Sequence, residues 1–280
     1  MLRILVSIIV FCGVVFANED APTWTIDQAM TNLQKGNERF VKGKPKVWDS
    51  GAAKREHLAA GQTPYACIIS CSDSRVPPEQ IFDAGLGELF VIRVAGNVTP
   101  KEVLASADYA VGHLHCPVVL VMGHTKCGAV GAALSESDFP EPLNTLVNEI
   151  RSSVEACQSK GYGTDDLYSG VIKENARNGA STLISGSLAI EQAVSEGTCV
   201  VLSAVYDIET GKVSWESQLS AVAMQKTDSE SHPVTEAPKA EESKPDPSHK
   251  SVAKTERKVD KISSEQSQAN RKNSGSKYKH

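Results

Sequence analysis

The stretch from Ala66 to Gln80, "ACIISCSDSRVPPEQ", joins a short apolar run to a cluster of reactive side chains. The run as far as Ser70 is continuously apolar rather than alternating, which indicates a strand that is buried on both faces. Cys71, Asp73 and Arg75 follow directly at its end. A thiol, a carboxylate and a guanidinium within five residues indicate a functional site at the end of this strand.

Three further apolar runs extend the pattern along the chain. Buried strands are expected at residues 65–70, 89–94, 117–122 and 198–207. Segments with helical spacing alternate with them, at 101–114 between the second and third strands and at 141–156 after the third. This alternation predicts an α/β fold with a mainly parallel central β-sheet flanked by α-helices. Residues 206–215 predict a closing hairpin with Thr210 and Gly211 at its turn.

The two ends of the chain have a different composition. Residues 1–17 begin with one Arg and an apolar run of about a dozen residues, and small or apolar residues precede a cleavage point after Ala17, as in a secretory signal. The chain is therefore expected to be exported, either to the periplasm or to the exterior. The alternative is that residues 1–17 stay as an uncleaved membrane anchor, although their apolar run is short for a membrane span. Residues 226–280 are rich in Lys, Ser, Glu and Pro and are expected to be a disordered charged tail.

Residues 18–225 remain as the expected catalytic domain. The domain opens with a helical pattern at 25–43, which is expected to form an N-terminal helical arm. The formal net charge of the whole chain is −5, so nothing indicates nucleic-acid binding.

A second motif explains the cluster after the first strand. In "VVLVMGHTKCGAV", residues 118–130, His124 follows the third strand and Cys127 lies three residues later. Because ligand sites of parallel sheets lie at the carboxyl ends of the strands, Cys71, His124 and Cys127 are expected to meet there. One His and two Cys suit zinc, and three protein ligands leave one coordination position open, as in catalytic sites. Asp73 is a candidate fourth ligand that Arg75 could hold away from the metal through a paired hydrogen bond.

The "CSDSR" and "HTKCG" motifs together resemble those of the β-class carbonic anhydrases. The segments "GNERFVKG", "GELFVIRVAGN" and "YDIETGKV" extend the resemblance over most of the folded region. It implies one zinc ion per chain and the reversible hydration of carbon dioxide to bicarbonate and a proton, by attack of zinc-bound hydroxide. It also implies that Cys71, His124 and Cys127 bind the metal and that Asp73 and Arg75 form the family's catalytic dyad.

The resemblance further implies substrate-binding residues and an assembly. Gln62 matches a glutamine that reaches the zinc site of the neighbouring subunit, and the backbone of Gly128 is expected to face bicarbonate. The family forms homodimers or multiples of dimers whose N-terminal helices wrap the partner, which would give neighbours to the apolar residues of the helix at 25–43. Ile68 stands where some members carry a Trp of an inhibitory bicarbonate pocket, so that pocket is not expected here.

Several alternatives stay open at this point. The same scaffold also supports hydrolysis of carbonyl sulfide or carbon disulfide, and a non-catalytic zinc or redox-binding protein is a further candidate. Cys71 and Cys127 could also be plain buried thiols or a disulfide, although His124 and Asp73 would then have no explanation. The proton shuttle could be His57 or the buffer. Disulfides are possible among four other cysteines, namely Cys67, Cys116, Cys157 and Cys199.

A second pair of histidines, His113 and His115 in "GHLHC", could indicate another metal site. The favoured interpretation is that they end a helix and bond its last carbonyls.

Overall fold

The computed structural model describes residues 24–135 and 137–219. The predicted signal at 1–17 and the predicted tail at 226–280 lie outside the described residues. Among the helices that are described, none combines the length and the apolar character that a membrane crossing requires.

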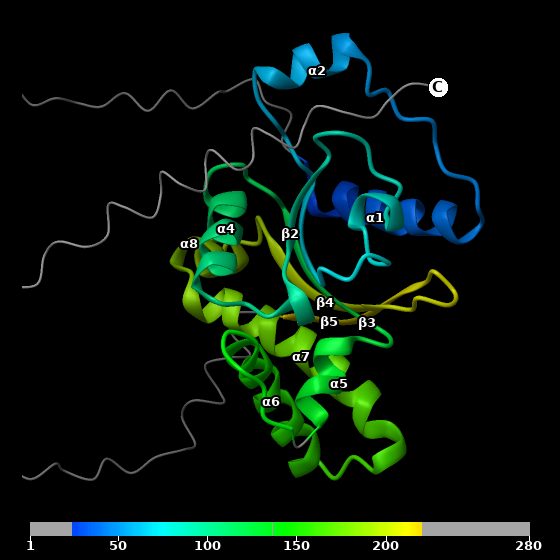
Figure 1. The fold of residues 1–280 in the computed structure, drawn as a ribbon. Helices are drawn as coiled ribbons and strands as arrows, with labels where there is room; N and C mark the ends of the chain where they lie inside the picture. Colours follow the sequence, from blue (N-terminus) through cyan, green and yellow to red (C-terminus); the bar gives the residue numbers. More distant parts are fainter. Residues whose placement is uncertain (1–23, 136, 220–280) are drawn as a thin grey trace, which may run out of the picture. The chain divides into compact units, whose positions relative to one another are not determined.

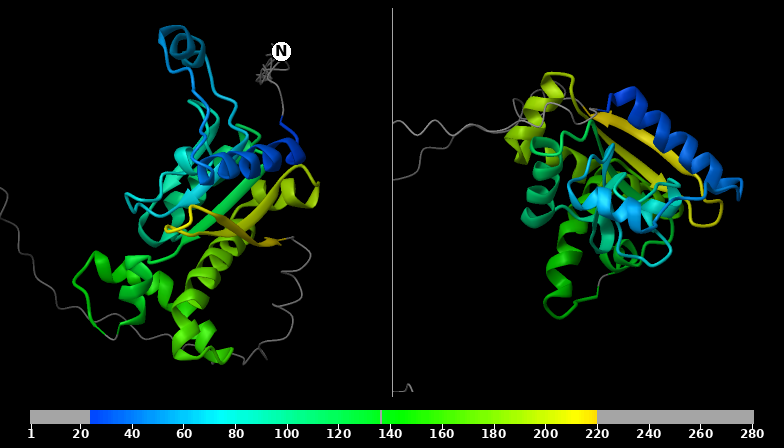
Figure 2. Two further views of the ribbon diagram at one scale, coloured as in Figure 1. Left: turned by 90° about the vertical axis from the view of Figure 1, so that its right-hand side faces the viewer. Right: turned by 90° about the horizontal axis from the view of Figure 1, so that it is seen from above.

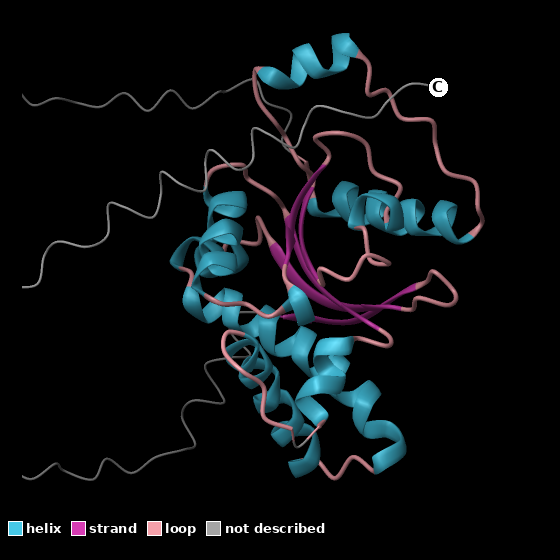
Figure 3. Ribbon diagram, in the orientation of Figure 1, coloured by secondary structure: helices cyan, strands magenta, loops and turns pink. Residues whose placement is uncertain are grey.

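A five-stranded sheet forms the centre of the fold (Figures 1 and 3). Its strands are β1 (Ala66–Ser70), β2 (Leu89–Arg93), β3 (Val118–His124), β4 (Val200–Tyr206) and β5 (Val213–Leu219). The spatial order is β2-β1-β3-β4-β5; the first four strands are parallel, and β5 pairs antiparallel with β4. The predicted α/β fold and the predicted hairpin at Gly211 are both confirmed.

Helices cover both faces of this sheet, as Figures 1 and 2 show. One face packs against α1, and the other packs against α4, α7 and α8. The α-helices are α1 (Ile26–Val41), α2 (Ala52–Ala59), α3 (Pro78–Ile81), α4 (Lys101–Gly112), α5 (Gly128–Leu134), α6 (Leu143–Ser159), α7 (Thr164–Gly186) and α8 (Leu188–Ser195). A short 3₁₀ helix, η1 (Ala95–Asn97), follows β2.

The position of α1 differs from the expectation that it needs a partner subunit for its apolar residues. Ala29 and Leu33 are fully buried against the same chain's sheet. Gly36 lies so close to α3 that an added Cβ would stand 1.8 Å from the Phe82 carbonyl oxygen. Asn37 also donates to the carbonyls of Ile81 and Gly211. Leu33 therefore belongs to the core of its own chain, whereas Ile26 and Met30 are only partly buried against that core.

The segment that follows α1 leaves the body of the domain and carries α2 outward (Figure 2). No residue of α2 is buried. Its base is tied to the domain by Asp83, a buried carboxylate that forms an ion pair with Arg39. Asp83 also accepts hydrogen bonds from the Lys46 backbone and from Trp48 Nε1, at 3.1 and 3.0 Å. The part of the chain that projects is thus α2 with its flanking loops, and not α1.

Residues 178–189 form most of the carboxyl half of α7, the break before α8 and the first residues of α8. The glycines of this stretch allow close packing rather than a loop. An added Cβ at Gly179 would lie 3.2 Å from Val121 Cγ1, so the helix approaches β3 closely at this point. The sequence pattern understates this helix because three glycines, Gly170, Gly179 and Gly186, interrupt its apolar spacing.

Candidate metal centre

Three donor side chains meet at the carboxyl edge of the sheet. Cys71 follows β1 directly, His124 is the last residue of β3, and Cys127 precedes the first residue of α5. Their ligand atoms all lie within 4.8 Å of one another. All three residues are buried, with His124 fully so. The predicted convergence of two strand ends on one point is therefore confirmed.

The His124 ring is prepared to bind a cation. Its Nδ1 lies 2.9 Å from the carbonyl oxygen of Thr125, which acts as the acceptor and fixes the proton on Nδ1. Its Nε2 is buried and has no hydrogen-bond partner within the described part of the chain. A buried lone pair without a partner is costly unless an ion or a donor faces it. The donor set of one imidazole and two thiols within reach of one point fits zinc.

The two cysteines of the cluster differ from the other thiols in their electrostatics. The hydrogen bond from Cys127 lowers the pKa of Cys71 although burial opposes this, and the bond from the backbone N–H of Gly96 lowers it further. The same hydrogen bond raises the pKa of Cys127, and burial and the charge of Cys71 raise it further. Two neighbouring thiolates therefore conflict in the absence of a cation. A bound divalent cation removes that conflict and favours both thiolates.

The remaining cysteines behave as core residues. Burial raises the pKa of Cys116 and of Cys199, each to about 12, and raises that of Cys67 as well. All described cysteines, Cys157 included, are free thiols in this structure. Cys67, Cys116 and Cys199 lie in one buried core cluster, whereas Cys157 of α6 lies in the cluster that also contains Cys71 and Cys127. No disulfide joins these four cysteines here.

Asp73 and Arg75 form a two-pronged ion pair beside the cluster. Arg75 Nε lies 2.9 Å from Asp73 Oδ1, and Arg75 Nη2 lies 2.7 Å from Asp73 Oδ2. The Arg75 backbone N–H donates to Oδ1 as well. These bonds hold the pKa of the Asp73 carboxyl well below its usual range. The predicted Asp73–Arg75 pair is therefore present in the structure. The Asp73 carboxylate faces Arg75 and is not part of the group formed by Cys71, His124 and Cys127.

The two expected substrate-binding residues lie in different places. Gly128 is exposed directly after Cys127, and the space around its missing Cβ is open to at least 4 Å. Gln62 is exposed in the loop that precedes β1, whereas Cys71 follows this strand. At about 3.3 Å per strand residue, the two ends of β1 stand roughly 15 Å apart. Gln62 therefore cannot serve the metal centre of its own chain.

Two residues near the centre were missed by the sequence interpretation. Arg93, at the end of β2, donates to the carbonyls of Cys71 and Asp73, at 3.1 and 2.6 Å. Tyr168 of α7 donates to the Cys127 carbonyl at 2.7 Å. Both hold the backbone of a ligand-bearing turn, and only the three-dimensional arrangement of the elements reveals them.

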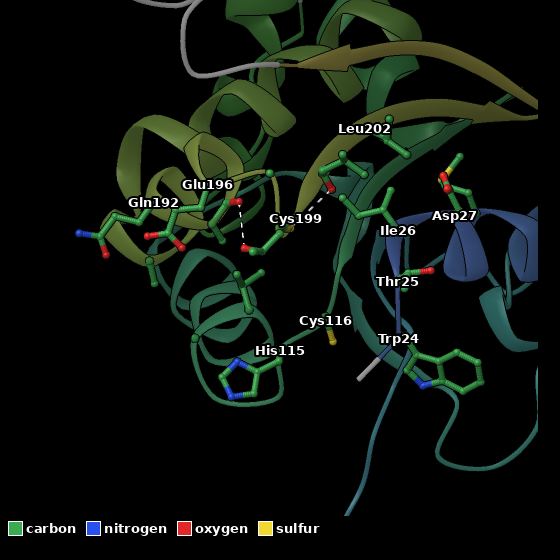
Figure 4. Close-up of a pocket in the computed structure, with 18 residues that line it drawn as sticks. Trp24, Thr25, Ile26, Asp27, His115, Cys116, Gln192, Glu196, Cys199 and Leu202 are labelled. Carbon is green, nitrogen blue, oxygen red and sulfur yellow. Dashed lines mark hydrogen bonds between the residues drawn. The ribbon is translucent and has the colours of Figure 1, made fainter. Parts of the chain in front are cut away.

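His113 and His115 lie at the end of α4, as expected, but neither ring bonds a helix carbonyl in the part of the chain that the structure describes. His113 is the C-cap residue, and its ring stacks on Tyr109 with the centroids 5.1 Å apart. His115 follows with a positive φ of 53°. It lines a groove of about 1240 Å³ together with Trp24, Cys116 and Cys199 (Figure 4). Cys116 and Cys199 precede β3 and β4, so this groove lies at the opposite edge of the sheet from the metal centre.

Comparison with known proteins identifies the family. Residues 66–213 match the family described as carbonic anhydrase. The chain belongs to the carbonic anhydrase family. Carbonic anhydrase 2 of Mycobacterium tuberculosis is 37% identical over 184 residues, which cover 64% of this chain and 87% of that protein. The carbonic anhydrase of Mycolicibacterium smegmatis is 34% identical, with 68% and 93% covered.

Solved structures place the chain in the β class of this family. A β-carbonic anhydrase of Coccomyxa, solved with acetazolamide, has a TM-score of 0.56 at 25% identity and covers 71% of this chain and 91% of its own. A β-carbonic anhydrase of Sordaria macrospora, described as tetrameric, has a TM-score of 0.55 at 25% identity, with 59% and 87% covered. The family uses zinc, which agrees with the donor set of Cys71, His124 and Cys127. The predicted family, enzyme class and cofactor are therefore confirmed.

Proposed function

We propose that this chain is an exported carbonic anhydrase that hydrates carbon dioxide reversibly at a shared site between two subunits. Cys71, His124 and Cys127 would hold one zinc ion, and Asp73 with Arg75 would orient the reacting water. The observation that carries the proposal is the buried group of three donors within 4.8 Å, beside a fully paired carboxylate and guanidinium.

When bound, zinc lowers the pKa of a coordinated water and so makes hydroxide available near neutral pH. The chain's own residues supply orientation. Arg75 keeps Asp73 ionised, so this carboxylate can only accept a hydrogen bond. A water that donates to Asp73 keeps its remaining lone pairs free for the carbon of carbon dioxide. The open space at Gly128 lets the product approach the backbone next to Cys127.

The position of Gln62 supports an assembly of two chains. Its amide lies at the far end of β1 and would reach the metal centre of a partner subunit, where its N–H group could donate to the developing bicarbonate. Gln62 lies in the loop between β1 and α2, and α2 projects from the body of the domain (Figure 2). Homodimers or multiples of dimers are the assembly we propose.

The proposed localisation rests on the two termini of the sequence. A signal at residues 1–17 would export the protein to the periplasm or the exterior, and residues 226–280 would remain as a charged tail. The six free thiols among the described residues are all buried, so the fold shields them from the oxidants of such a compartment.

Zinc stoichiometry measured together with stopped-flow hydration of carbon dioxide tests the proposal. We expect one zinc per chain and fast turnover, with metal and activity lost together in Cys71→Ala. Turnover of carbonyl sulfide and carbon disulfide, measured at the same enzyme concentration, separates the alternative substrates. Purified protein that binds zinc but hydrates no carbon dioxide would contradict the proposal.

A further inference from the structure

One face of α7 contacts the backbone of all three segments that surround the metal centre. Tyr168, Ile172 and Asn175 lie four and three residues apart, so they share this face. Tyr168 bonds the carbonyl of Cys127 at 2.7 Å, and Ile172 packs against Gly123, the residue before His124. A helix remote in sequence from the motifs thus supports the segments that carry Cys127 and His124 directly.

The third contact of this face leads to a ligand atom. Asn175 is buried, and its Nδ2 donates to the carbonyl oxygen of Gly96 at 2.8 Å. The N–H of the same Gly96 donates to Cys71 Sγ at 3.3 Å. A hydrogen bond from Asn175 therefore fixes the residue whose amide contacts the sulfur.

The geometry of η1 leaves Gly96 dependent on such support. The φ of Gly96 is 66°, which is in the left-handed region. A Cβ added to Gly96 would stand 2.6 Å from Ile150 Cδ1. Glycine is the residue that fits here, but it also gives the chain the most freedom to rotate. A side-chain bond to its carbonyl restricts that rotation and keeps its N–H aimed at Cys71.

We infer that Asn175 is a positioning residue for the metal centre, acting through Gly96 on the donor strength of the Cys71 sulfur. This inference rests on the proposed function, because it requires Cys71 to bind the metal. A hydrogen bond to a thiolate draws electron density from the sulfur and weakens its donation to the metal. Outer-shell contacts of this kind typically change metal affinity or activity by about 10–100-fold when they are removed.

The test compares Asn175→Leu with a matched control on the same helix, Asn178→Leu. Asn178 is half-buried and donates to Ser153 Oγ at 3.0 Å, so the control also removes one amide hydrogen bond. Each protein is loaded with cobalt, and the thiolate-to-metal charge-transfer absorption is recorded. We expect a shift to longer wavelength in N175L alone, because a sulfur without its hydrogen bond gives up an electron more easily. Zinc affinity, measured by competition with a chelator, is expected to fall about 10-fold or more in N175L and to stay unchanged in N178L.

A second measurement uses the unmodified protein, so it stands even where N175L does not fold. In protein loaded with ¹¹³Cd, the Gly96 amide proton should show scalar coupling to the metal through its hydrogen bond to Cys71. Absence of that coupling, or equal spectra and affinities for N175L and N178L, would overturn the inference. Wild-type protein that binds no metal would instead contradict the proposed function, so the two failures are distinguishable.

Discussion

Asp83 offers a quantitative test of how the projecting segment is fastened to the domain. Its side chain is 3% exposed, and it pairs with an Arg39 side chain that is 26% exposed. Removing one partner of a buried ion pair costs about 3–5 kcal/mol. Because Arg39 is partly hydrated and an Asn side chain still accepts hydrogen bonds, we expect Asp83→Asn to lower the free energy of unfolding by about 2–3 kcal/mol.

The assay is thermal and urea unfolding followed by circular dichroism. For a domain of this size each kcal/mol lowers Tm by about 2–4 °C, so we expect a loss of about 4–12 °C. The matched control is Asp49→Asn, because Asp49 is exposed and accepts only a local bond from the Gly51 backbone. A difference between D83N and D49N smaller than about 0.5 kcal/mol at pH 7 would refute the reasoning.

The pH dependence gives an independent check on the same residue. Burial opposes ionisation of Asp83, but the bonds from Arg39, Lys46 and Trp48 outweigh it and lower its pKa. A carboxyl with a lowered pKa in the folded state stabilises the protein above its unfolded-state pKa of about 4. That contribution is lost as the pH falls through the folded-state pKa. The gap in stability between wild type and D83N is therefore expected to narrow below pH 4, and a constant gap would argue against an electrostatic origin.

Three further predictions concern activity. Turnover is expected to rise from pH 6 to 9, because two thiolates cancel the charge of zinc. A water bound to such a zinc is a weaker acid than one bound to zinc with three neutral histidines. The low pKa of Asp73 keeps it ionised over this range, so its own titration cannot produce the rise. A flat profile would contradict this. Deleting residues 226–280 is expected to leave turnover unchanged, which stopped-flow assays of both chains would check. Activity is expected to require a dimer, so a fully active monomer in the ultracentrifuge would exclude the role of Gln62 in a partner's site.

The sequence predicted those structural features that depend on residues close together in the chain. Continuous apolar runs identified the four parallel strands to within two residues at their ends, because a strand buried on both faces needs such a run. The convergence of Cys71, His124 and Cys127 followed from strand ends that must meet at one edge of a parallel sheet. The Asp73–Arg75 pair lies two residues apart in sequence, so its geometry is local as well.

The parts that sequence reasoning missed depend on contacts between distant segments. The apolar stripe of α1 does not specify whether the same chain or a partner covers it, and here Leu33 packs on the sheet of its own chain. Helix α7 was understated because Gly170 and Gly179 weaken its pattern, although these glycines permit close packing. A helical pattern records which residues are apolar, but not which distant surface they meet.

These two classes of residue combine at the metal centre. The three donors come from local motifs, whereas the backbone around them is held by Arg93, Tyr168 and Asn175, which lie up to about a hundred residues away. A strand end alone leaves a ligand free to move, and a loss of even a fraction of an ångström in placement weakens a metal site. The distant contacts therefore account for how three donors from separate segments stay within 4.8 Å of one another. It follows that variants of α7 would change the metal centre without touching any residue of the two motifs.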